Sequence, residues 1–182
     1  LTACGTPPAY EMQTTAAATR ATTAARTIMV REVSMPDYAT DDAMARQDGG
    51  GAVTILRRVR WADLQPRAVT LALSRQLNDT LTATVAPEPW PLSGLPDREV
   101  DVRAERILAG NAGVFRLNGA YYVRAEGVNS GGPSRNFAIA APINGTARAN
   151  TAAPSPESAD PMAQAIARSA ARFACRPCAS AA

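Results

Sequence analysis

Apolar and polar residues alternate along several short segments of this 182-residue chain, and a period of two predicts β-strands. The alternation is cleanest where Val100, Val102 and Ala104 lie between charged residues. The run 52–60 places Val53, Ile55 and Val59 on one strand face. Further short runs rich in β-branched residues predict strands at 27–33 and 135–143.

Residues 114–125 allow two interpretations, because Asn118-Gly119 is a common two-residue hairpin turn. A hairpin would put Arg116 and Tyr121 on the same face and so mix charged and aromatic residues. One continuous strand instead gathers the apolar side chains on a single face: Phe115, Leu117, Tyr121, Val123 and Ala125. We therefore expect one continuous strand.

Two segments show a helical period. The first has large apolar residues at every fourth position: Val69, Leu73, Leu77 and Leu81. We expect Asp63 to cap this helix and Pro66 to lie in its first turn. The second begins at Asp160-Pro161, ends before Pro177, and has an apolar stripe: Met162, Ile166, Ala170 and Phe173.

These elements predict the α+β class: a mostly antiparallel sheet with two amphipathic helices packed on one face. We expect a single α+β domain over residues 27–176 and a short tail over 177–182. Residues 1–26 are rich in Thr and Ala and poor in large apolar side chains, so we expect a flexible tether there.

The amino-acid composition excludes several classes of catalysis and binding. The chain has no His, which excludes serine and cysteine hydrolase mechanisms that use imidazole and removes the commonest metal ligand. The Asp and Glu residues show no forced pairing, so we expect no enzymatic activity, no cofactor and no metal site. All 19 basic residues are Arg, and they are scattered rather than gathered in a stripe, so we do not expect nucleic-acid binding.

The opening residues, Leu1-Thr2-Ala3-Cys4-Gly5, resemble the end of a lipoprotein signal peptide. In that interpretation residues 1–3 are a lipobox remnant and the Cys4 thiol is the lipid attachment site. The alternative is an ordinary cysteine near the start of the chain. No run of 18 apolar residues is present, so attached acyl chains would provide the membrane contact.

Cys175 and Cys178 form a CxxC pair at the expected end of the second helix. Redox-active pairs lie at a helix start, where the helix dipole lowers the thiol pKa, and this pair lies at the opposite end. We therefore expect a local disulfide in an oxidising compartment, with free thiols as the alternative.

Four features together resemble the ABC-type transport auxiliary lipoprotein family, the PqiC-like group. These are the Cys4 lipobox, the turn Met35-Pro36-Asp37-Tyr38, the run Arg60-Trp61-Ala62-Asp63 before the first helix, and the Ala-rich closing segment around Gln164. The resemblance covers most of the chain. Asp63 stands where the family has Glu, and Pro66 falls two residues later than the family's Pro.

The resemblance implies a lipoprotein on the periplasmic face of the outer membrane. Its partners would be a periplasmic MCE-domain (mammalian cell entry) protein and an ABC transporter complex that moves lipid between membranes, and self-association is a further expectation. The alternative function is an envelope assembly or cell-wall-synthesis accessory lipoprotein. Trp61 and Tyr122 are candidate partner contacts, although a core position for Trp61 is the simpler interpretation.

Overall fold

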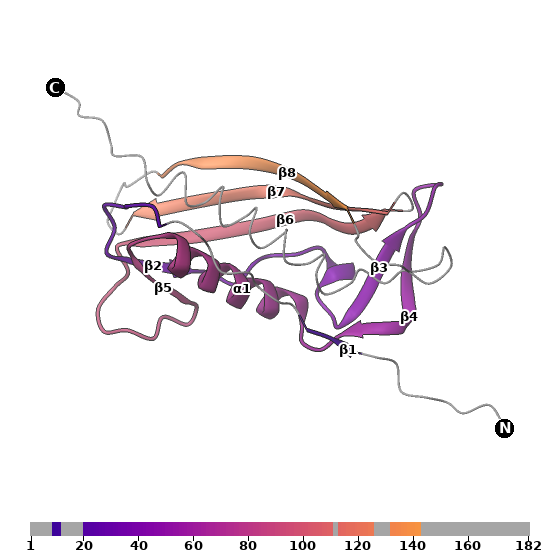
Figure 1. The fold of residues 1–182 in the computed structure, drawn as a ribbon, viewed down its shortest axis with the longest axis horizontal. Coiled ribbons are helices and arrows are strands. Elements are labelled where there is room, and N and C mark those ends of the chain that lie inside the picture. Colours follow the sequence, from indigo (N-terminus) through magenta and orange to yellow (C-terminus); the bar gives the residue numbers. More distant parts are fainter. Residues whose placement is uncertain (1–8, 12–19, 111–112, 126–131, 143–182) are drawn as a thin grey trace.

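The structure is a computed structural model that describes residues 9–11, 20–110, 113–125 and 132–142. These residues form an eight-stranded mixed sheet that curls around one α-helix (Figure 1). The elements are β1 (Ala9–Tyr10), β2 (Thr27–Val30), the 3-10 helix η1 (Asp37–Ala39), β3 (Ala43–Gln47), β4 (Val53–Trp61), α1 (Gln65–Thr80), β5 (Thr84–Pro87), β6 (Arg98–Gly110), β7 (Val114–Ala125) and β8 (Ser134–Pro142).

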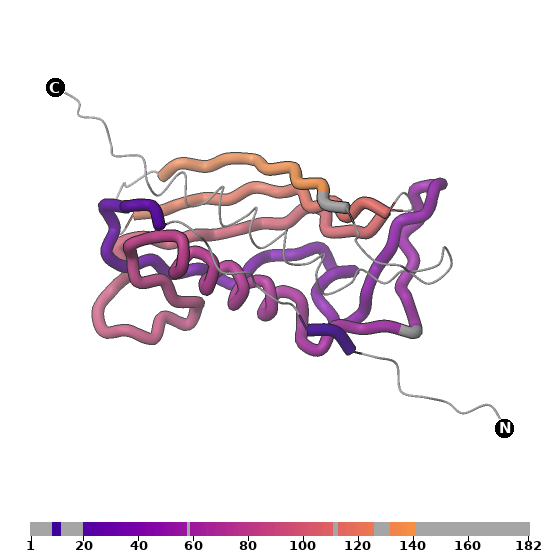
Figure 2. The backbone as a smooth tube through the Cα atoms, viewed as in Figure 1, coloured from indigo at the N-terminus to yellow at the C-terminus, as the bar shows by residue number. Residues whose placement is uncertain are grey.

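Strand β6 organises the sheet, because it pairs with three other strands. Along one edge it pairs with β7 over its length, and β7 then pairs with β8. Its other edge is shared: β2 pairs near its start, where Val30 lies opposite Val100, and β3 pairs at its end, where Gln47 lies opposite Gly110. The backbone trace shows β3 and β4 leaving this layer as a separate hairpin (Figure 2).

The expected mostly antiparallel sheet with two helices on one face is wrong, because the sheet is mixed. Antiparallel pairing joins β3 to β4, β6 to β7 and β7 to β8. Parallel pairing joins β1 to β4, β2 to β5, β2 to β6 and β3 to β6. Parallel neighbours need long connections, and the alternating pattern of one strand does not identify which distant strand will pair with it. The described residues contain one α-helix; the expected helix beginning at residue 160 lies outside them.

Helix α1 buries the predicted apolar face against β2 and β5. Its four periodic residues have almost no exposed surface: Val69, Leu73, Leu77 and Leu81. The expected cap is wrong, since Leu64 occupies the N-cap position and no side chain caps the helix. The Asp63 carboxylate instead accepts hydrogen bonds from the Leu64 backbone N–H and from the Arg67 guanidinium. Pro66 lies in the first turn, as predicted.

The continuous strand expected at 114–125 is confirmed as β7, with the predicted apolar face buried except for the half-buried Ala125. Gly119 lies in its middle, beside a β-bulge in β6 between Ala104 and Arg106. A Cβ atom at Gly119 would meet the Arg103 carbonyl oxygen at 2.1 Å. Glycine is therefore required here by close approach of the backbones, and not by a hairpin turn.

Three strands were missed by the pattern: β1, which lies in the expected tether, and β3 and β5. Residues 39–47 look polar, but Ala43–Gln47 forms β3, and the Pro-rich segment after α1 begins with β5. The apolar face predicted for β4 is only partly buried, because Val59 packs against the core whereas Val53 and Ile55 are 42% and 45% exposed. Leu56, on the other face of this strand, packs against the core.

Candidate functional site

The first candidate surface is a pocket where β1 meets the end of β4. Tyr10 lies in register beside Trp61, and the Tyr10 carbonyl oxygen accepts a 2.7 Å hydrogen bond from the backbone N–H of Ala62. Residues 9–11 fall inside the segment expected to be a tether, yet they pair with the domain. They form one wall of the pocket, and the first half of α1 forms the other.

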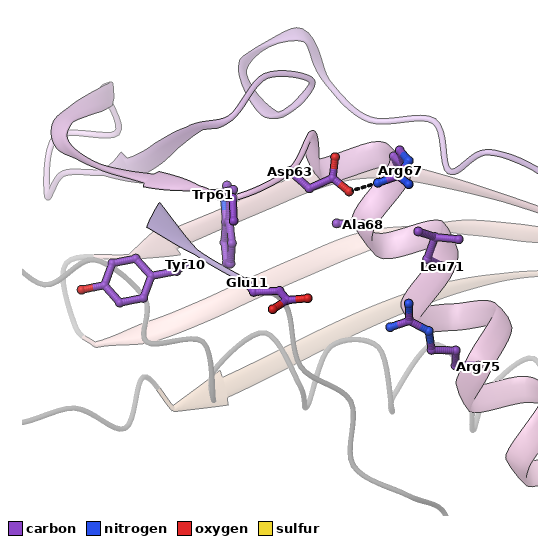
Figure 3. A pocket seen from close by; sticks show the side chains of 9 residues that line it. Tyr10, Glu11, Trp61, Asp63, Arg67, Ala68, Leu71 and Arg75 are labelled. Carbon is purple, nitrogen blue, oxygen red and sulfur yellow. Dashed lines mark hydrogen bonds and ion pairs between the residues drawn. The ribbon is translucent and has the colours of Figure 1, made fainter. Parts of the chain in front are cut away.

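This pocket has a volume of about 330 Å³ and combines aromatic, aliphatic and charged side chains (Figure 3). Tyr10 and Trp61 contribute the aromatic groups, and Ala68 and Leu71 contribute aliphatic surface from α1. Trp61 itself is only 7% exposed, so most of its ring belongs to the core. The pocket is therefore a partly apolar hollow that is open to solvent and anchored on a rigid indole.

Four charged residues line this pocket, and two of them neutralise each other. Asp63 and Arg67 form an ion pair across one turn at the start of α1. Glu11 and Arg75 are exposed and form no ion pair with any described residue. In Figure 3 their charged ends extend into the space between the residue 9–11 segment and α1. Among the described residues, the pocket thus offers one carboxylate and one guanidinium that form no ion pair.

A second hollow of about 480 Å³ continues along α1 and shares Leu71 and Arg75 with the first. Its further lining includes Asn78 near the helix end and Val85 and Pro87 of β5. Arg75 therefore stands where the two hollows meet. Together they run along the exposed side of α1 from its first turn to its last.

The second candidate surface surrounds Tyr122 on β7. Asp101 of β6 lies opposite Tyr122 and is only 7% exposed. Its Oδ2 accepts hydrogen bonds from Arg124 Nη2 at 2.8 Å and Arg103 Nη2 at 3.1 Å. The Arg103 guanidinium lies 5.2 Å from the centre of the Tyr122 ring, a cation–π distance. The hydrogen bond from Arg103 to Asp101 and their mutual attraction raise the pKa of Arg103, so its charge is fixed.

The predicted site residues are thus separated. Trp61 is a core residue that also lines the first pocket, whereas Tyr122 is 37% exposed within its own cluster on β7. Cys4, Cys175 and Cys178 lie outside the described residues. Over the described ranges, no cluster of side chains could hold a metal ion, and no helix is long and apolar enough to cross a membrane.

The sequence pattern missed Tyr10, Glu11 and Arg75 as pocket residues. Tyr10 and Glu11 stand in a Thr/Ala-rich segment, and nothing local indicates that they pair with β4. One signal was available: Tyr10 is the only aromatic residue before position 38, so a large side chain there needed a packing partner. Arg75 lies off the apolar stripe of its helix, and helical spacing alone does not distinguish it from other exposed polar residues.

Solved structures share this fold. A protein from Xanthomonas campestris described as DUF330 has a TM-score of 0.71 at 15% identity, covering 93% of this chain and 96% of its own. A structure described only as an uncharacterized protein has a TM-score of 0.63 at 17% identity, covering 93% and 97%. At such identities the likeness defines the class of fold and nothing more. No curated protein sequence matches the chain.

The family is shown by the sequence itself. Residues 10–168 match the family described as ABC-type transport auxiliary lipoprotein component. The chain belongs to this family, and the resemblance seen in its motifs is confirmed. It is therefore an auxiliary component of the ABC-type transport class, and its family is one of lipoproteins.

Proposed function

We propose that this protein is the outer-membrane-anchored lipoprotein subunit of an ABC/MCE-type intermembrane lipid transport system. It docks protein partners in the periplasm and performs no chemistry of its own. The observation that carries the proposal is family membership over residues 10–168, joined to a cysteine at position 4 in a lipobox-like setting.

The anchor and the domain are close in the chain, which supports a docking role near a membrane. Ala9 lies five positions after Cys4, and Ala9 is already paired with Arg60 of β4. An extended chain of that length spans at most about 18 Å. Lipid on Cys4 would therefore hold the β1–β4 end of the sheet next to the bilayer.

The Tyr122 cluster is the partner contact that we favour. Tyrosine and arginine are enriched among residues that dominate binding energy at protein interfaces. Here Asp101 holds Arg103 and Arg124 in place, and Arg103 in turn holds the exposed Tyr122 ring. Side chains fixed in advance lose little entropy on binding. Trp61 is the weaker candidate, because its small exposed fraction leaves little to bury.

The first test is chemical. Mass spectrometry of the N-terminus from native membranes should show diacylglycerol, or a triacyl form, on Cys4, and Cys4→Ser should release the protein from the outer membrane fraction. A native Cys4 without lipid would contradict the anchor.

The second test concerns partners. A photo-crosslinking residue at position 122 should capture an MCE-domain protein, whereas one at Leu95, which is 71% exposed in the loop between β5 and β6, should not. Capture of a cell-wall synthase at position 122 would support the alternative envelope-assembly function and contradict lipid transport. Equal capture at both positions would remove Tyr122 as the docking site.

A further inference from the structure

We propose that the pocket between residues 9–11 and α1 binds the headgroup of a zwitterionic phospholipid carrying a primary ammonium, a phosphoethanolamine group. The ligand comes from the membrane that holds the anchor, so this inference rests on the proposed function of Cys4. The proposal stands on the charges, the apolar lining and the location of the pocket.

The charges fit a zwitterion better than a simple ion. Asp63 and Arg67 satisfy each other, which leaves Arg75 and Glu11 as the uncommitted groups. A guanidinium binds a phosphate through two parallel hydrogen bonds, and a carboxylate accepts hydrogen bonds from a primary ammonium. A simple anion would meet the Glu11 carboxylate, and a simple cation would meet Arg75. Only a ligand with both charges uses both groups.

A ligand that binds Glu11 and Arg75 breaks little existing interaction. Glu11 and Arg75 are both exposed, and exposed opposite charges attract each other only weakly through water. A ligand that inserts between them therefore displaces little existing interaction. It also supplies a partner to each group within a partly enclosed hollow, where hydrogen bonds between charged groups are stronger than at an open surface.

The apolar lining fits the part of a lipid next to its headgroup. Tyr10 and Trp61 are the residue types that gather at membrane–water interfaces, where one side of a ring meets apolar chains and the other meets water. Leu71 borders both hollows beside Arg75, so the start of an acyl chain can pack on Leu71 while its phosphate lies next to the guanidinium.

The pocket lies close in the chain to the proposed lipid anchor, which would place it near membrane phospholipids. Tyr10 lies six residues after Cys4, a separation that an extended chain spans in at most about 22 Å. A lipid attached to Cys4 would keep the pocket at the bilayer surface, where phospholipid headgroups are at very high local concentration.

The chain contains two tryptophans, Trp61 and Trp90, so one substitution leaves a single reporter inside the pocket. Trp90→Phe suits this purpose, because the Trp90 Nε1 has no hydrogen-bond partner among the described residues. The full chain carrying Cys4→Ser and Trp90→Phe is titrated with short-chain phosphatidylethanolamine, phosphatidylglycerol and phosphatidylcholine, and with free glycerophosphoethanolamine. Trp61 emission is followed throughout.

We expect phosphatidylethanolamine to shift Trp61 emission and to bind at least fivefold more tightly than phosphatidylglycerol or phosphatidylcholine. Glycerophosphoethanolamine should bind more weakly than the lipid, because it lacks acyl chains to contact Leu71. Equal or tighter binding of this free compound would identify a soluble metabolite as the ligand and overturn the lipid assignment. Absence of any preference for the ethanolamine lipid would contradict the proposal that this pocket binds a phosphoethanolamine headgroup.

Single substitutions test whether Arg75 binds the phosphate and Glu11 binds the ammonium of the headgroup. Arg75→Gln should weaken the binding of both phosphatidylethanolamine and phosphatidylglycerol about tenfold, the loss expected for a charged hydrogen bond. Glu11→Gln should weaken phosphatidylethanolamine about fivefold and leave phosphatidylglycerol unchanged. Arg116→Gln and Glu105→Gln are matched controls on exposed residues of β7 and β6, and neither should change affinity.

The outcome of the binding experiment does not depend on whether native Cys4 carries lipid, because the titrated protein has Cys4→Ser and no lipid. If native Cys4 is lipidated but the protein shows no preference for the ethanolamine lipid, the proposed headgroup site is wrong and the proposed lipid anchor stands. A preference that Arg75→Gln and Glu11→Gln leave unchanged would place the lipid elsewhere on the protein and overturn the proposal.

Discussion

Strands β4 and β7 have similar alternating sequences, but the fold buries the apolar face of β7 more completely than that of β4. On β7, the apolar face is buried, and Leu117 lies in register between Ile107 of β6 and Ile139 of β8. On β4, Val53 and Ile55 are exposed. Alternation shows that a segment is a strand, whereas its place in the sheet decides whether its apolar face is covered.

The physical difference lies in the neighbours. β7 pairs with strands on both sides along its length. β4 pairs with β3 on one side, and β1 reaches only Arg60 and Trp61 on the other. The protein is thus firmly built around β6 and β7 and more open at the β3–β4 hairpin. Four substitutions or conditions test this difference, from the largest expected effect to the smallest.

Leu117→Ala should give the largest loss, about 3 kcal/mol of unfolding free energy, because it opens a cavity in a site that is 1% exposed. Urea denaturation followed by circular dichroism measures this loss. A loss below about 1 kcal/mol would show that the β7 face is less tightly packed than its burial indicates.

Gly119→Ala should lower the unfolding free energy by about 2 kcal/mol, because the added Cβ meets the backbone of the β6 bulge and the strands must move apart. Gly50→Ala in the β3–β4 turn is the control, since a Cβ there meets only Asp48 Oδ1, at 3.5 Å. If the two alanine variants unfold at the same urea concentration, the close approach at Gly119 is not tight.

Burial raises the pKa of Tyr121, while Arg135 acts in the opposite direction. The unfolded chain therefore releases this proton before the folded chain does, so stability should fall as pH rises above the ordinary tyrosine value of about 10. Tyr121→Phe should reduce this alkaline loss, measured as the change in melting temperature between pH 8 and pH 11. Tyr122→Phe, on the exposed face of the same strand, should keep it.

Ile55→Thr should change the unfolding free energy by less than about 0.5 kcal/mol, because the side chain is already 45% exposed and threonine suits a strand. A loss comparable to that of Leu117→Ala would show that something covers β4 in solution and would remove the contrast between the two strands.

Local pattern predicted much of the framework. The face of α1 was predicted because a spacing of four fits the helical repeat, and β6 and β7 because alternation fits a half-buried strand. The pattern failed at β3, where half-buried polar residues hide a strand, and at the α1 cap, where Asp63 pairs with Arg67 instead of capping the helix. It also could not show that the segment around Tyr10 pairs with β4, fifty residues later in the chain.

The sequence by itself determined the family, the absence of imidazole chemistry, and the positions of α1 and of the longer strands, because these depend on residue type and short-range spacing. Tertiary structure decided that the sheet is mixed, that Gly119 lies against the backbone of β6, and that Glu11 and Arg75 border one pocket. These features depend on which distant segments become neighbours, and that choice follows from the packing of the whole chain around β6.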